Sequence, residues 1–154
     1  MYSRQMVVVR AESEIRTLQD LKGKRIAVQA TTKAEDLFLH NIESNLPQAE
    51  QVNCFSSSNE LYAALRKNYA DAIAGHEAML GSLVKEGKDA YRMLDESIYK
   101  SELGVAFKKG THEEVAADLT ETLKKLQREG ITEKIVTKYG LDADEILLEG
   151  EQNE

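Results

Sequence analysis

The stretch Leu18-Gln-Asp-Leu-Lys-Gly-Lys-Arg-Ile-Ala-Val-Gln-Ala-Thr-Thr-Lys-Ala-Glu-Asp36 decides the fold of this chain. It predicts a short helix, a tight turn at Gly23 and a buried strand over residues 25–29. Thr32 and Glu35 then have the Thr-x-x-Glu spacing of a capping box, which predicts a helix start. A helix that begins directly after a strand presents backbone N–H groups and the positive end of its dipole to anions. The stretch therefore predicts an anion site at a strand end, where open α/β sheets bind ligands.

Strand and helix signals alternate along the rest of the chain, which predicts an α/β fold with a mainly parallel sheet flanked by helices. The predicted strands are residues 6–10, 25–29, 51–55, 71–74, 91–94 and 103–108. The predicted helices are residues 34–45, 57–68, 77–86, 111–129 and 132–139. Two further capping boxes, Ser57 with Glu60 and Thr111 with Glu114, mark helix starts. The acidic stretch from Asp142 onward has no clear period and is expected to be a mobile tail or a linker.

Composition narrows the class of protein. At 154 residues the chain is expected to form one domain, and its net charge of −7 argues against nucleic acid or an anionic membrane surface as partner. No run of apolar residues is long enough to span a bilayer, and no secretory signal precedes Tyr2. The single cysteine, Cys54, cannot form an internal disulfide and is expected to be a buried strand thiol.

Four segments resemble, in order and spacing, the second lobe of bacterial extracellular solute-binding proteins, in the polar-amino-acid family of ABC importers. The matching positions are Leu18, Asp20, Leu21, Lys22, Gly23, Lys24, Ile26, Ala27, Val28, Gln29 and Thr32, then residues 63–75 and 103–110, and finally Leu123, Leu126, Gly130, Ile135, Lys138, Tyr139 and Gly140. The resemblance implies one lobe of a type 2 periplasmic binding fold, followed by C-terminal helices.

The resemblance also implies a division of the chain. Residues 1–110 correspond to the second, ligand-binding lobe, residues 111–140 to helices that normally return to lobe one, and residues 141–154 to an acidic tail. The segment that begins at Tyr2 resembles the crossover into the second lobe, so the first part of lobe one is expected to be absent. By the same resemblance, the full-length protein is periplasmic or extracellular and carries a lipid or membrane anchor upstream.

The resemblance places a ligand carboxylate at the turn formed by Thr31, Thr32 and Lys33. Thr32 matches the hydroxyl residue of the family, whereas Thr31 stands where glycine is usual and Lys33 where a second small residue is usual. Lys33 adds positive charge beside the helix start, which favours an anion. The alternative is that Thr32 only caps the helix.

The residue after Gly75 departs most from the family pattern. An aspartate typically follows this glycine and pairs with the ligand's ammonium group, but here the residue is His76. A histidine is neutral or cationic and cannot replace a carboxylate, which speaks against an ordinary α-amino acid as ligand. Glu77 is a weaker candidate on the next position. We expect His76 and Thr32 to lie close together at one edge of the sheet, although His76 alternatively is only a solvated residue at a helix start.

Metal, cofactor and catalytic motifs are incomplete or missing in the sequence. His76-Glu77 and His112-Glu113 each begin the His-Glu-x-x-His zinc pattern, and neither completes it. The sequence has no Gly-x-Ser-x-Gly elbow, no P-loop and no Gly-x-Gly-x-x-Gly. We therefore expect no metal, no cofactor and no catalysis.

The leading functional interpretation is a solute-binding module of an ABC importer or of a membrane sensor, working with a permease or a sensor transmembrane partner. Its ligand is a small polar solute, an amino acid or a related anion. The alternatives are an enzyme on the same fold, similar to dehydratases, and a lobe that has lost its ligand. An apolar stripe of Val115, Leu119, Leu123 and Leu126 needs a partner, and we expect a homodimer through the C-terminal helices.

Overall fold

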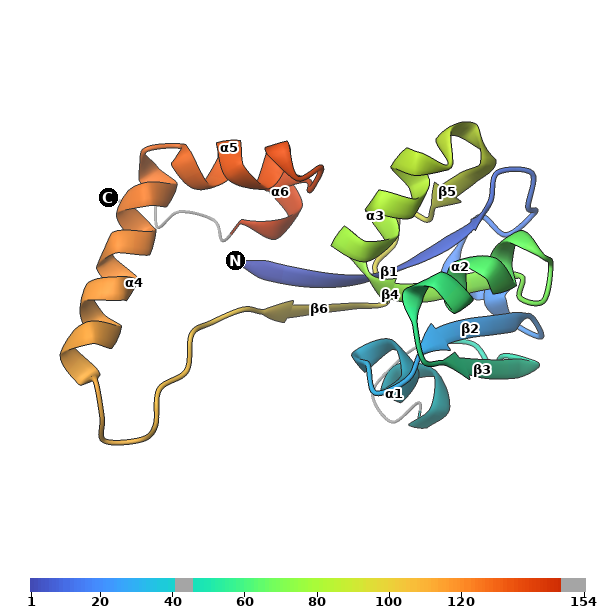
Figure 1. Cartoon of the computed structure of the whole chain (residues 1–154), viewed down its shortest axis with the longest axis horizontal. Coiled ribbons are helices and arrows are strands. Elements are labelled where there is room, and N and C mark those ends of the chain that lie inside the picture. The colour runs from blue at the N-terminus through green and yellow to red at the C-terminus, as the bar shows by residue number, and fades with distance from the viewer. Residues whose placement is uncertain (41–45, 148–154) are drawn as a thin grey trace. The chain divides into compact units, whose positions relative to one another are not determined.

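The computed structural model describes residues 1–40 and 46–147 and divides the chain into two compact units. The larger unit is Arg4–Lys100. The smaller one combines Met1–Ser3 with the chain from Ser101 onward. The elements are labelled in Figure 1, and the larger unit carries the sheet that positions the candidate site.

The larger unit alternates strands and helices as the sequence predicts. Its strands are β1 (Tyr2–Arg10, which begins in the smaller unit), β2 (Arg25–Gln29), β3 (Gln51–Phe55), β4 (Ala72–His76) and β5 (Tyr91–Met93). Its helices are α1 (Lys33–His40), α2 (Ser58–Arg66) and α3 (Glu77–Glu86), with short 3₁₀ turns at Leu18–Leu21 and Lys88–Ala90. The predicted continuation of α1 over residues 41–45 lies outside the described residues.

The strands form one sheet in the order β3-β2-β4-β1-β5, and β6 (Tyr99–Glu102) also pairs with β1. β2 is parallel to both β3 and β4, whereas β1 is antiparallel to β4 and to β5. The sheet is therefore mixed, and the expectation of a mainly parallel sheet holds only for β3, β2 and β4. Strand direction could not be predicted, because a strand buried on both faces has the same apolar pattern in either direction.

Apolar side chains fill both faces of the sheet in the larger unit. On one face Val7 and Val9 of β1 pack in a cluster with Leu37 of α1. On the other face Met6 and Val8 pack in a cluster with α2 and α3. Because successive side chains of a strand point to opposite faces, the continuous apolar run of β1 serves both clusters. Helices thus cover both faces of the sheet, α1 on one face and α2 and α3 on the other.

Local capping chemistry explains where α2 begins. Ser57 accepts a hydrogen bond from the N–H of Glu60, and the Glu60 carboxylate accepts one from the N–H of Ser57 at 3.0 Å. The predicted capping box at Ser57 is therefore confirmed.

The corresponding prediction at Thr111 is wrong. The Thr111 hydroxyl donates instead to the carbonyl of Lys108 at 2.7 Å, and α4 (Glu113–Arg128) begins after His112 in a left-handed conformation.

The smaller unit contains α4, α5 (Ile131–Lys138) and α6 (Ala143–Ile146). Gly130, with a φ of 69°, separates α4 from α5 as expected. The predicted tail after Asp142 is partly wrong, since Asp142 caps α6 by accepting from the N–H of Asp144, and Ile146 is buried. Residues 148–154 of that tail lie outside the described residues.

Two further predictions are wrong, the burial of Cys54 and the strand over residues 103–108. Cys54 is exposed, because β3 lies at the end of the sheet and only part of it is covered. The predicted strand over residues 103–108 is unpaired, and the strand of this region is β6, immediately before it.

Candidate functional site

The candidate site is the edge of the sheet where β2 and β4 end. The two strands are parallel neighbours, with Val28 opposite Ala74 in register. The segment that leads into α1 follows β2, and α3 follows β4 directly. The parallel register therefore brings the starts of α1 and α3 to the same sheet edge, as the sequence predicts for Thr32 and His76.

Thr31 occupies a strained backbone conformation at this edge. Its φ is 62°, in the left-handed region where a β-branched residue is rare. Its N–H donates to a carboxylate oxygen of Glu35 at 2.7 Å, and its hydroxyl donates to the carbonyl of Ala30 at 2.6 Å. Thr31 thus adopts a conformation that glycine reaches without strain, and the hydrogen bond to Glu35 stabilises it.

Thr32 is the cap of α1. Its hydroxyl oxygen accepts a long hydrogen bond, 3.4 Å, from the N–H of Glu35 and donates to the carbonyl of Gln29 at 2.6 Å. Its carbonyl accepts the N–H of Asp36 at 3.3 Å, which is the first helical bond. The capping role is therefore established. The predicted box differs in one detail, because the Glu35 carboxylate reaches the N–H of Thr31 instead of that of Thr32.

Lys33 supplies positive charge at the first position of α1. Its ammonium group pairs with Asp36 at 3.0 Å and lies 4.8 Å from the centroid of the Tyr99 ring. Both contacts hold the side chain near the helix start, and the pair with Asp36 is half exposed and correspondingly weak.

Glu35 introduces negative charge in the first turn of α1. Hydrogen bonds from the Cys54 thiol and then from the N–H of Thr31 hold the pKa of Glu35 below its usual value. Although Cys54 is exposed, partial desolvation of its thiol and then the hydrogen bond and charge of the Glu35 carboxylate raise the pKa of Cys54 to about 11. This edge of the sheet therefore holds an ionised carboxylate on the β3 side, next to a thiol whose pKa is raised.

His76 ends β4 and caps α3. Its Nδ1 accepts a hydrogen bond from the N–H of Ala78 at 3.2 Å, and the residue is exposed. In the neutral ring this acceptor role assigns the hydrogen to Nε2, which is then a donor. His76 thus offers an N–H, not a carboxylate, at the edge shared with Thr32.

Glu77 is turned into the structure instead of toward solvent. Its carboxylate forms a bidentate ion pair with Arg4, with Nε–Oε2 at 2.9 Å and Nη2–Oε1 at 2.5 Å, and both side chains are at most 10% exposed. This pair ties the start of α3 to β1. Sequence reasoning missed Arg4, because 73 residues separate the partners and no local pattern connects them.

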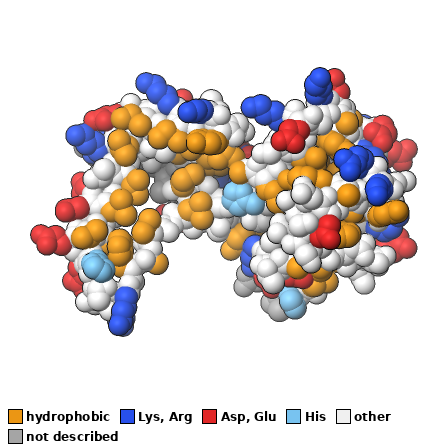
Figure 2. Space-filling view, in the orientation of Figure 1, with side chains coloured by type: hydrophobic (Ala, Val, Ile, Leu, Met, Phe, Trp, Pro, Cys, Tyr) orange, Lys and Arg blue, Asp and Glu red, His pale blue; other side chains and the backbone are white. Residues whose placement is uncertain are grey.

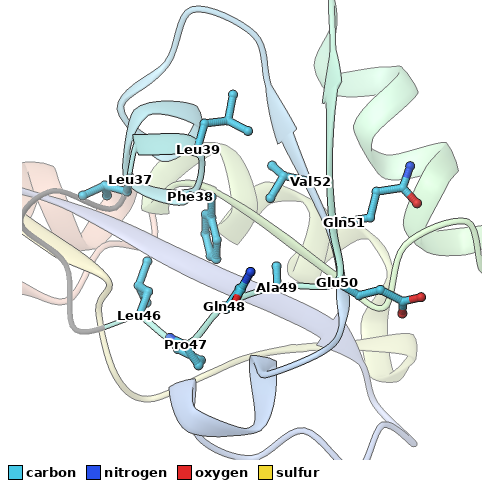
Figure 3. Close-up of a pocket in the computed structure, with 10 residues that line it drawn as sticks. All are labelled: Leu37, Phe38, Leu39, Leu46, Pro47, Gln48, Ala49, Glu50, Gln51 and Val52. Atoms are coloured by element: carbon cyan, nitrogen blue, oxygen red, sulfur yellow. The ribbon is translucent and has the colours of Figure 1, made fainter.

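A separate pocket, of about 400 Å³, lies between α1 and the start of β3. Figure 3 shows its lining, which includes Phe38, Leu46 and Val52. Because parallel β2 and β3 begin at this end, the pocket is at the opposite edge from Thr32 and His76. It therefore does not form part of the candidate site.

Among residues 1–40 and 46–147, no group of three or more His, Cys, Asp or Glu side chains is placed to hold a metal ion. No helix among them is both long and apolar enough to cross a bilayer.

Comparison with known families supplies the context for this geometry. The model of the family described as "ABC transporter, phosphonate, periplasmic substrate-binding protein" matches residues 2–145. Among curated proteins, the L-cystine-binding protein TcyJ of Escherichia coli (strain K12) is 27% identical over 128 residues. That match covers 83% of this chain but 46% of TcyJ, so the chain spans about half the length of this relative.

Solved structures give the same fold. Substrate binding domain 2 of Lactococcus lactis GlnP, in the open conformation, is 25% identical with a TM-score of 0.71, and the match covers 92% of this chain and 60% of that one. The cysteine-binding protein of Campylobacter jejuni is 24% identical with a TM-score of 0.65, over 97% and 61% of the two chains. The sheet flanked by helices is thus one that substrate-binding proteins share.

Proposed function

The chain belongs to the family of periplasmic substrate-binding proteins of ABC transporters, and on that premise we propose that its larger unit binds a small anionic solute without catalysis. One observation carries the proposal. The starts of α1 and α3 follow the C-terminal ends of two adjacent parallel strands, and both present groups that can donate to an anion.

Three side chains have defined roles in this proposal. Thr32 donates its hydroxyl to the solute, giving up its bond to the carbonyl of Gln29, and Lys33 contributes charge from the first turn of α1. His76 donates from Nε2 on the neighbouring strand end. Thr31 shapes the turn through its left-handed backbone. Glu77 has no role as a ligand group, since it is engaged with Arg4.

The chemistry of His76 narrows the class of solute. The names of the relatives describe binding of cystine, cysteine, glutamine and arginine, and the family description names phosphonate. A free α-amino acid brings an ammonium group, for which His76 is no partner. We therefore favour a solute without an ammonium group, such as a phosphonate, over a zwitterionic amino acid.

An enzymatic role has less support. TcyJ and the structural relatives are named as binding proteins. A dehydratase-like reaction would need an acid or base at the sheet edge, and His76 and Glu77 are the local candidates from sequence. His76 Nδ1 already accepts from the backbone of α3, and Glu77 is buried in its pair with Arg4, which speaks against either side chain acting as a general base. The reading in which the edge holds no ligand is an outcome of the experiment below.

The biological setting of the chain follows from the family as a further proposal. We place the full-length protein in the periplasm or outside the cell, lipid- or membrane-anchored, where it delivers the solute to an ABC permease or serves a membrane sensor. Exposed apolar residues on α4 and α5, including Val115, Leu123 and Ile135, need a covering partner, which a second copy of the chain would provide.

Isothermal titration calorimetry of the full chain tests the proposed function. We expect methylphosphonate to bind more tightly than L-cystine or L-glutamine, and Thr32→Val or His76→Ala to weaken its binding. Thr120→Val, on α4, and His40→Ala, at the other end of α1 from Thr32, are matched controls, and they should leave binding unchanged. His76→Asp should shift the preference toward amino acids. Micromolar affinity for L-cystine or L-glutamine, or no binding of methylphosphonate, would contradict the proposal.

A further inference from the structure

The segment between β6 and α4 has the sequence of a strand but no strand partner. Leu103, Val105 and Phe107 alternate with small or polar residues, the pattern that predicts a strand. Figure 1 nevertheless shows a plain coil after β6. The backbone groups of residues 104–107 make no hydrogen bond with any other described residue.

The side chains of this segment are also uncovered. Leu103 is 49% exposed, Val105 64% and Phe107 37%, and residues 102–110 are exposed throughout. Figure 2 shows hydrophobic side chains gathered on the part of the molecule that carries α4 and α5, which belongs to the same unit. An unpaired strand sequence with an apolar face is a template for pairing with another chain.

The sequence of the segment is self-complementary about Val105. In an antiparallel pair centred on that residue, Leu103 of one chain lies opposite Phe107 of the other, and Val105 lies opposite itself. On the other face of the strand, Glu102 lies opposite Lys108. By symmetry the Leu103–Phe107 pair and the Glu102–Lys108 pair each form twice, and Val105 meets its own copy once.

We propose that residues 102–108 form an antiparallel strand pair with the same residues of a second copy of this chain, about a twofold axis through Val105. Such an interface is isologous, as in most homodimers. Its occupant is a second copy because the charges and the apolar face match under this one operation.

Hydrogen-bond geometry selects the side of the strand that pairs. The N–H of Leu103 donates to the carbonyl of Met1 at 2.8 Å, on the side of β1. Backbone groups alternate sides along a strand, so those of Gly104 and Ala106 point away from β1. Gly104 and Ala106 of the two copies would exchange hydrogen bonds, which makes Val105 a non-hydrogen-bonded pair. The carbonyl of Lys108 already accepts from Thr111, so the paired segment ends there.

Charge reversal tests the register. In sedimentation velocity of the full chain at micromolar concentrations, we expect a dimer, and Glu102→Lys or Lys108→Glu alone should weaken it about tenfold, because like charges then meet at two symmetric positions. The double variant Glu102→Lys with Lys108→Glu should restore it. Lys109→Glu, opposite the uncharged Ser101, is the matched control and should have no effect. A monomeric chain, or a dimer that neither single reversal weakens, would overturn the proposal.

Cross-linking tests the axis independently. In a Cys54→Ser background, Val105→Cys should form an intermolecular disulfide on mild oxidation, since non-hydrogen-bonded partners have Cα atoms about 4.5 Å apart. Ala106→Cys should not, because its own symmetry mate is two positions away in register. Equal cross-linking of both variants would refute the strand pair. Loss of the dimer in Leu123→Glu, with no effect of the charge reversals, would place the interface on α4 and also refute it. Methylphosphonate binding is tested with variants of Thr32 and His76, and the dimer with variants of residues 102–108. The proposed function and the strand pair can therefore fail independently.

Discussion

The buried ion pair between Arg4 and Glu77 yields the prediction that the structure supports in most detail. The two side chains are 10% and 9% exposed and share two hydrogen bonds. Removing one partner leaves the other as an uncompensated buried charge, which typically costs about 3–5 kcal/mol. We therefore expect Glu77→Ala to lower the free energy of unfolding by about that amount, a large fraction of the ~5–15 kcal/mol of a typical domain.

Replacing both partners separates the charge effect from the packing effect. Arg4→Met combined with Glu77→Leu keeps most of the volume without burying a charge, so its stability should be close to that of the natural chain or higher by about 1–4 kcal/mol. Asp36→Ala, at an exposed ion pair with Lys33, is the matched control, with an expected cost of about 1 kcal/mol or less.

The assay is urea denaturation followed by circular dichroism, with unfolding free energies from linear extrapolation. The reasoning is refuted if Glu77→Ala costs no more than the Asp36→Ala control. It is also refuted if the double replacement is as unstable as the single one, because the loss would then come from packing and not from an unpaired charge.

Three further predictions concern other parts of the chain. The hydrogen bond from Arg25 lowers the pKa of Asp71 in the folded chain. The stabilisation from this ion pair is therefore fully present above the ordinary carboxyl pKa of about 4, and it is lost as the pH falls through the lower pKa of Asp71 in the folded chain. Asp71→Asn should thus cost about 1 kcal/mol at neutral pH, and urea titrations should show this difference vanishing in acid. With a pKa of about 11, Cys54 should react with iodoacetamide at mildly alkaline pH roughly a hundredfold more slowly than a free cysteine. Glu35→Gln should accelerate this reaction, and equal rates for the natural chain and the variant would contradict the contact between Glu35 and Cys54. Ile146→Ala should destabilise the C-terminal helices by about 2–4 kcal/mol, visible as faster amide hydrogen exchange in α5 and α6, whereas unchanged exchange would indicate that α6 does not pack there.

The sequence predicted those parts of the fold that depend on local pattern. The bounds of β2 and β3 were predicted correctly, because each is a short strand bounded by turns and caps. The start of α2 was predicted because Ser57 and Glu60 form a closed local motif. The error at residues 103–108 has the opposite cause, since a strand exists only where another strand pairs with it, and that information is not local.

The candidate site divides in the same way. Thr32 and His76 were identified from the residues that follow strand ends, and the structure places both at the edge of two parallel strands. The roles of Arg4 and Glu35 could not be predicted from pattern. Arg4 meets Glu77 only through the fold, and Glu35 reaches the N–H of Thr31 only because Thr31 adopts a left-handed backbone.

Binding of an anion at the edge of β2 and β4 is the central claim, and a chemical-shift titration tests it most directly. Methylphosphonate is added to the ¹⁵N-labelled full chain while backbone amide shifts are followed. We predict that the largest changes fall on Thr32, Lys33 and His76, and that Thr32→Val reduces them. Changes centred instead on the pocket around Phe38 and Val52, or no saturable change at all, would contradict the claim.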